Sequence, residues 1–298
     1  MRPKRKISTN PSRGFRQAVP SIAEAIRRQR DDLKRVLGAY GSNAGPNGLH
    51  DLRVALRRSA ALGRLFEGHP GPKDGRQVRK LADGLRRQLS AARQHEVSLE
   101  LIRLLARKDE ALFRLVAPPL SSGKGAPRHP GIADVQRTGE EVLSAMDKWR
   151  KAAQDGAASK AADRELQRSV ERRVSKQAKQ ILAIGVPERR TLHPLRIACK
   201  KLRYELEILR EVVPGVERVV RASRRVQEVF GEANDWACVV EDLSRASRTL
   251  GPKEKRVVSA LLLRAESFRQ RCFRRARQLT ADFLPHVENV AHLVMPGR

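Results

Sequence analysis

Aromatic residues are scarce in this chain of 298 residues, which has two tryptophans, two tyrosines and seven phenylalanines. Readers of single-stranded nucleic acid usually stack bases on such rings, so the sequence gives that class little support. Acidic residues are also few, at 33 against 62 lysines and arginines, and the formal net charge is +29. This excess goes beyond what solubility requires and indicates a polyanionic partner. Nucleic acid, polyphosphate and an acidic membrane surface all fit the composition.

Cysteines and long apolar runs are scarce as well. Cys199, Cys238 and Cys272 are widely spaced and form no Cys-x-x-Cys pair, so the sequence indicates a reducing compartment rather than a disulfide framework or a zinc site. No run of 18 apolar residues occurs, and no apolar signal-peptide segment follows the basic N-terminus. We therefore expect a soluble, cytoplasmic protein whose residues 1–19 form a basic, disordered arm.

Arginine supplies 46 of the 62 basic residues. Its planar guanidinium donates pairs of hydrogen bonds to phosphate oxygens, which the ammonium of lysine does not do. A bias toward GC-rich codons is an alternative explanation for the same excess.

Apolar residues recur with a period near 3.6 and strand-like alternation is nearly absent, so the sequence predicts an all-α protein. Clusters of glycine and proline mark the ends of segments. The predicted helices span residues 20–40, 49–67, 75–93, 95–117, 132–152, 160–184, 192–213, 216–232, 235–250 and 253–280. Residues 118–131, with Gly123-Lys124-Gly125, lack the spacing of a phosphate-binding P-loop and are predicted to be a flexible linker.

One ten-residue segment occurs twice. LHDLRVALRR at residues 49–58 returns 143 positions later as LHPLRIACKK at residues 192–201, with five identical positions. Duplication explains this better than chance and predicts two similar halves packed together. We expect one helical bundle at residues 20–152 and a second at residues 153–298.

Helical projection divides both copies into a packing face and a basic face. The expected inward residues are Leu52, Ala55, Leu56 and Ser59 in the first copy and Leu195, Cys199, Leu202, Leu206 and Leu209 in the second. The expected outward residues are His50, Arg53 and Arg57 in the first copy and His193, Arg196, Lys200, Arg203 and Tyr204 in the second. Like charges aligned on one helix face repel one another, and a bound polyanion would remove this repulsion.

The start of the second copy has the features of a helix N-terminus. Thr191 is predicted to be the N-cap residue, and Pro194 is tolerated in the first turn. Such a terminus attracts anions. Alternatively, each histidine only caps its helix or bonds across the bundle. Further arginines share faces downstream and either extend the anion contact or form a solvated face; they are Arg79, Arg86, Arg93, Arg221, Arg224 and Arg225.

These motifs resemble the CHAD domain family, whose hallmark is His-x-x-Arg-(Val/Ile)-x-x-basic-basic near the start of a helix in each of two halves. The first copy matches at His50, Arg53, Val54, Arg57 and Arg58, and the second at His193, Arg196, Ile197, Lys200 and Lys201. Leu202-Arg203-Tyr204 and Glu207 continue the second match, and residues 227–235 are similar to a later Gln-x-x-Leu-Gly-x-x-Asn-Asp element. The first half departs from the family at Arg93-Gln94-His95-Glu96-Val97, where Arg-Asp-x-Asp-Val is usual. The resemblance covers roughly residues 20–285.

The resemblance implies two helical bundles related by a pseudo-two-fold axis, forming one compact domain with a basic groove that holds inorganic polyphosphate. We expect a non-catalytic binder without cofactor or metal. Its purpose stays open among recruitment to polyphosphate granules, protection or sequestration of the polymer, and scaffolding of another protein. Nucleic acid is the alternative partner. The contacts that it implies are His50, Arg53, Arg57, Arg58, His193, Arg196, Lys200, Lys201, Arg203 and Tyr204.

His50-Asp51 is a residue pair that also occurs in metal-dependent HD phosphohydrolases, which suggests an enzymatic alternative. The second copy has Pro194 in place of Asp51, so the acidic neighbour is not part of the duplicated chemistry. A row of arginines is also a poor site for a divalent metal ion. The sequence therefore favours binding over catalysis.

Overall fold

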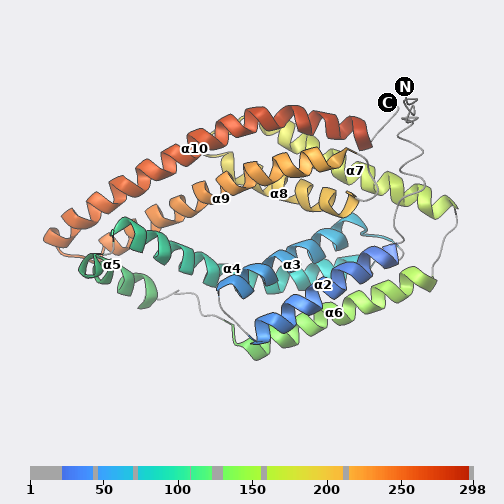
Figure 1. The fold of residues 1–298 in the computed structure, drawn as a ribbon, viewed down its shortest axis with the longest axis horizontal. Coiled ribbons are helices and arrows are strands. Elements are labelled where there is room, and N and C mark those ends of the chain that lie inside the picture. The colour runs from blue at the N-terminus through green and yellow to red at the C-terminus, as the bar shows by residue number, and fades with distance from the viewer. Residues whose placement is uncertain are drawn as a thin grey trace, which may run out of the picture.

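The computed structural model describes residues 22–42, 46–69, 73–107, 109–122, 130–155, 160–210 and 215–294. Within these ranges the regular secondary structure is entirely helical, which confirms the predicted all-α class (Figure 1). The helices are α2 (Ile22–Ser42), α3 (Pro46–Leu65), α4 (Asp74–Leu105), α5 (Glu110–Ser122), α6 (Ile132–Asp155), α7 (Lys160–Ile184), α8 (Leu192–Leu209), α9 (Val216–Ser247) and α10 (Pro252–Val294). The expected N-terminal arm and Gly123-Lys124-Gly125 lie outside the described residues.

Two predicted helix breaks were wrong. α4 is continuous through residues 93–95, where neither proline nor glycine interrupts the chain. α9 is continuous through Gly231 and Asn234-Asp235, because Phe230, Trp236 and Val239 stay on its buried face and hold the helix across this polar stretch. Both helices are 32 residues long.

The single helix predicted at residues 95–117 was wrong, because α4 ends at Leu105 and α5 begins at Glu110 after Arg107, which has a positive φ of 53°. Three predicted boundaries also shift. α5 continues to Ser122, so the predicted linker begins as helix. α8 ends at Leu209, before residue 213. α10 extends well past residue 280 and includes Pro285. Proline normally interrupts a helix, but Phe283 and Val287 on either side of it are buried, and their packing holds this end of the helix.

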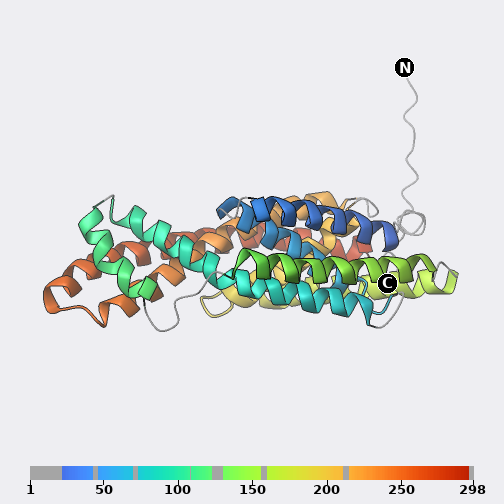
Figure 2. The same cartoon turned by 90° about the horizontal axis from the view of Figure 1, so that it is seen from below.

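The helices form two neighbouring groups (Figure 1). In the first group α2 packs on α3 and α6, and α4 packs on α3 and α6. In the second, α8 and α10 each pack on α7 and α9. The groups meet where α3 contacts α8 and α4 contacts α9. Figure 2 shows an elongated molecule with α5 near one end, beside the ends of α4 and α10.

One apolar core is shared by both groups. Every inward residue predicted for the two copies of the repeated segment is buried, from Leu52 and Leu56 of α3 to Leu195 and Leu202 of α8. Each such leucine contributes about 1.5–3 kcal/mol through burial. A smaller cluster lies near α5, where the Trp236 ring stacks on Phe268 with centroids 4.6 Å apart. Packing of the first core therefore fixes how α3 and α8 face one another.

No helix in the described part of the chain combines the length and the hydropathy needed to span a membrane.

Candidate functional site

The two copies of the repeated segment lie against each other, because α3 packs on α8. Their basic side chains come together at this junction, with two from α3 and three from α8. The charges of Arg53, Arg57, Arg196 and Arg203 all act on the Lys200 amine. We call Arg53, Arg57, Arg196, Lys200 and Arg203 the cation cluster.

The cluster is recessed and strongly positive. Burial and, to a smaller extent, the four neighbouring guanidinium groups together lower the pKa of Lys200 to about 6. Burial also lowers the pKa of Arg53 to about 10, assisted by Arg57, Arg93, Arg86 and Arg196. Two predicted arginines of α4, Arg86 and Arg93, therefore lie close enough to add to the field of the cluster.

Most of these cations have no carboxylate partner. Among the described residues, no carboxylate oxygen lies within 4.0 Å of the side-chain nitrogens of Arg53, Arg57, Arg196 or Lys200. The Nε atoms of Arg53 and Arg196 are buried and have no hydrogen-bond partner in the described part of the chain. Burying a cation without a partner costs free energy. An anion that enters the cluster would remove this cost.

The two halves of the cluster differ in one neighbour. Asp235 of α9 raises the pKa of Arg196, against the larger lowering by burial. In the first half, Arg93 of α4 is near the cluster instead, and its charge lowers the pKa of Arg53. The first-half side of the cluster is consequently the more positive one.

Both predicted histidines are exposed at the starts of their helices. Partial desolvation lowers the pKa of His50, and Arg57, Arg53 and Arg93 lower it further, while Asp51 raises it. Thr191 stands at the N-cap of α8, but the prediction that its side chain caps the helix was wrong. Its Oγ1 instead accepts a hydrogen bond from the Glu188 amide at 2.9 Å, in the preceding turn.

Three predicted contact residues lie outside the cluster. Arg58 is held by Asp32 at 3.6 Å and by Glu207 at 3.7 Å. Lys201 acts on Glu205, whose pKa burial raises to about 7 while Arg64, Arg173 and Lys201 oppose the rise. Tyr204 is 4% exposed, so its predicted place on the outward face was wrong. The Arg203 guanidinium lies over the Tyr204 ring, 4.4 Å from its centroid.

The remaining predicted arginines are mostly ion-paired. Arg79 pairs with Glu67 at 3.6 Å, Arg221 with Glu217 at 3.7 Å and Arg224 with Glu207 at 3.1 Å. Arg86 pairs with Asp83, and Arg93 with Glu96 and Glu100, so both carry a local counter-charge in addition to facing the cluster. Arg225 is exposed on α9. A solvated or paired face therefore accounts for Arg221 and Arg225 of α9.

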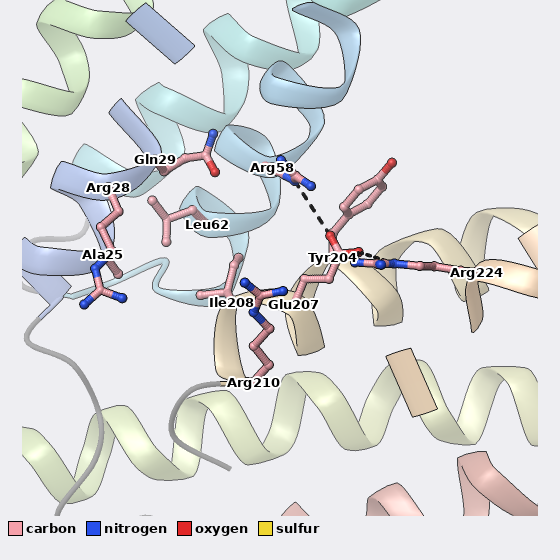
Figure 3. A pocket seen from close by; sticks show the side chains of 10 residues that line it. All are labelled: Ala25, Arg28, Gln29, Arg58, Leu62, Tyr204, Glu207, Ile208, Arg210 and Arg224. Atoms are coloured by element: carbon pink, nitrogen blue, oxygen red, sulfur yellow. Dashed lines mark hydrogen bonds and ion pairs between the residues drawn. The ribbon is translucent and has the colours of Figure 1, made fainter. Parts of the chain in front are cut away.

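A pocket beside the cluster was not predicted from the sequence. It has a volume of about 220 Å³ and lies between α2, α3, α8 and the start of α9 (Figure 3). We call this cavity the arginine pocket. Its charged lining residues are Arg28, Arg58, Arg210, Arg224 and Glu207. These residues come from four helices or helix ends with no common spacing, so no sequence signal joined them. Among the described residues, no group of three or more histidines, cysteines, aspartates or glutamates is arranged to hold a metal ion.

Comparison with known proteins connects this arrangement to one family. The sequence model of the CHAD domain matches residues 22–243. The crystal structure of the CHAD domain from the plant Ricinus communis is similar in fold, with a TM-score of 0.59 and 21% sequence identity over 92% of this chain and 93% of that chain. No curated protein matches the sequence.

Proposed function

Because this chain belongs to the CHAD domain family, we propose that it binds inorganic polyphosphate at the cation cluster and does not hydrolyse it. The observation that carries this proposal is the set of recessed cations without carboxylate partners among the described residues, contributed by both copies of the repeat. Guanidinium groups hold phosphate oxygens in pairs. A chain of phosphates would contact α3 and α8 together.

The recessed position of the cluster favours a thin polyanion over nucleic acid. Arg203 has a side chain that is only 17% exposed, and Arg53, Arg57, Arg196 and Lys200 are all partly covered. An unbranched phosphate chain carries nothing that would keep its oxygens from these groups. A duplex presents its phosphates on a broad, stiff surface, and it would meet the exposed, ion-paired arginines first.

A competition titration tests the choice of partner. Labelled duplex DNA or RNA is bound to the protein, and long-chain polyphosphate is added at equal phosphate concentration, at two salt concentrations. Binding of either polyanion releases counterions, so both affinities fall as the salt concentration rises. Salt dependence alone therefore does not distinguish polyphosphate from nucleic acid. We expect polyphosphate to displace both nucleic acids at each salt concentration. Displacement of polyphosphate by DNA would contradict the proposal and favour a nucleic-acid binder.

The absence of catalysis is a separate part of the proposal. The groups that meet in the cluster are guanidinium and amine groups, which bind phosphate oxygens, whereas divalent-metal phosphohydrolases gather carboxylate and histidine donors. We expect no orthophosphate release when the protein is incubated with polyphosphate and Mg²⁺ or Mn²⁺. Steady release that a cluster variant abolishes would overturn this part and leave the binding result standing.

The cellular place of the protein follows from the same proposal. A polyphosphate binder in the cytoplasm is expected at polyphosphate granules. A fluorescent fusion in phosphate-fed cells would then overlap the granules, and it would disperse in cells that make no polyphosphate. A diffuse signal in both would count against granule targeting.

A further inference from the structure

The arginine pocket contains a buried carboxylate as well as cations, which is unusual for a site that only attracts anions. Glu207 of α8 has a side chain that is 10% exposed. Arg58 reaches it from α3 and Arg224 from α9, as Figure 3 shows. The Nε atom of Arg203, one turn earlier on α8, lies 3.8 Å from Glu207 Oε1. The carboxylate is therefore surrounded by more positive charge than it neutralises.

The two oxygens of Glu207 are used unequally. Oε1 accepts hydrogen bonds from Arg224 Nη2 at 3.1 Å and Nε at 3.3 Å. Oε2 is buried and accepts no hydrogen bond from any described residue, since Arg58 Nε stays 3.7 Å away. A buried acceptor without a donor costs about 1–3 kcal/mol. The pocket therefore offers one hydrogen-bond acceptor among several cationic donors.

Such a lining selects for anions that bring their own proton. A fully deprotonated anion gains from the arginines, but its oxygens face Oε2 without a hydrogen between them. A phosphate group that keeps a P–OH can donate that hydrogen to Oε2 and accept from the arginines with its other oxygens. Sulfate has the same tetrahedral shape and no proton at neutral pH.

We propose that the arginine pocket is a binding site for a protonated phosphate group, with Glu207 Oε2 accepting the P–OH hydrogen bond and Arg58, Arg210 and Arg224 surrounding the other oxygens. Two sources supply this chemistry. Orthophosphate keeps one proton throughout the physiological pH range. The end of a polyphosphate chain keeps one only below its second ionisation, near pH 6 in phosphate monoesters, whereas interior phosphates have none. The chain-end source rests on the proposed function, and the orthophosphate source does not.

Calorimetric titration with orthophosphate and with sulfate, at matched charge near pH 8, tests the selectivity. We expect phosphate to bind at least about tenfold more tightly, as one charge-assisted hydrogen bond would give. Glu207→Gln offers a donor as well as an acceptor, so it is expected to bring the ratio close to one. Equal affinity for the two anions in the unchanged protein would overturn the proposal.

A second variant covers the case in which Glu207→Gln does not fold. Arg210 is exposed at the C-cap of α8, so Arg210→Ala should leave the thermal midpoint unchanged and weaken phosphate and sulfate by the same factor. The matched control is Arg248→Ala, since Arg248 is also an exposed arginine at a helix C-cap, that of α9, and does not line the pocket. Equal effects of the two variants on phosphate binding would contradict a site at the pocket.

Long polyphosphate with free or blocked ends separates the two sources. A preference for free ends at pH 6 that disappears at pH 8 and in Glu207→Gln assigns the pocket to chain ends. Equal binding of both polymers, with phosphate still preferred over sulfate, assigns it to orthophosphate. Failure of every long chain to bind refutes the proposed function and leaves the comparison of phosphate with sulfate as an independent result.

Discussion

If the protein binds polyphosphate as proposed, Lys200 is expected to make the affinity depend on pH between about pH 7 and pH 9. Burial and the charges of Arg196, Arg57, Arg53 and Arg203 lower the pKa of Lys200 from 10.5 to about 6. The amine is therefore mostly neutral in the free protein at pH 7.5. A bound polyanion favours the ammonium form. Binding is thus expected to take up a proton at Lys200.

The size of the effect follows from linkage. If the complex restores the ordinary pKa of Lys200, affinity falls about tenfold for each pH unit between pH 7 and pH 9, or about 1.4 kcal/mol per unit. Below pH 6 the amine is protonated in both states, so its contribution levels off. Calorimetric titrations of the protein with polyphosphate, in two buffers with different ionisation enthalpies, should show that close to one proton is taken up on binding at pH 7.5.

Two variants separate Lys200 from other titrating groups. Arg stays charged over this range, so Lys200→Arg is expected to bind at pH 8 more tightly than the unchanged protein and with no slope above pH 7. Lys200→Met should also lose the slope but bind more weakly at pH 6. An unchanged protein that takes up no proton at pH 7.5, or a slope that persists in Lys200→Arg, would refute this reasoning.

Two further predictions concern stability. Burial raises the pKa of Glu205 from 4.5 to about 7, so the folded state holds its proton more tightly and this contribution is lost as pH rises from 4.5 to 7. Denaturant titrations should show the free energy of unfolding of Glu205→Gln rising relative to that of the unchanged protein by up to about 3 kcal/mol across that range. A difference that does not change with pH would disprove the raised pKa of Glu205. Gly139 of α6 packs against Leu37, where an added Cβ would lie 2.5 Å from Cδ2, so Gly139→Ala should destabilise by about 1–3 kcal/mol. An added Cβ at Gly231 would meet no atom within 4 Å, so Gly231→Ala should stabilise α9 by about 0.5–1 kcal/mol. A higher thermal midpoint for Gly139→Ala than for Gly231→Ala would contradict the packing described around these two glycines.

The apolar period near 3.6 made the fold class predictable, and the repeated segment made the centre of the cation cluster predictable. Its inward leucines were identified from periodicity, because helix geometry fixes which side chains share a face. Arg53, Arg57, Arg196 and Lys200 followed from the opposite face and the structure brings them together. The resemblance to CHAD domains implied a basic groove lined by both copies, but the packing of α3 on α8 was not predicted, since the repeat does not state which faces meet.

Other features depended on tertiary contacts that a sequence does not display. Tyr204 projects toward the basic face of an isolated helix, yet contacts from neighbouring helices bury it. Arg58 and Lys201 share the motif, but Arg58 pairs across helices with Asp32 and Glu207, and the charge of Lys201 acts on Glu205, one turn further along α8. The continuity of α4 and α9 was missed because polar residues near their middles look like turns when their buried neighbours are unknown. The arginine pocket combines residues from separate helices and has no linear signature.

The most direct test of the central claim removes one cluster arginine from each copy of the repeat. Arg53→Gln combined with Arg196→Gln is compared with Arg137→Gln combined with Arg245→Gln, which removes the same charge from exposed arginines paired with Asp134 and Asp242. The cluster variant is expected to bind long-chain polyphosphate at least about a hundredfold more weakly. The slope of its log affinity against log salt should also be shallower, by the amount expected for about two lost phosphate contacts. The control should bind within a few-fold of the unchanged protein. Equal losses in the two variants would mean that overall charge, and not the junction of α3 and α8, holds the polymer.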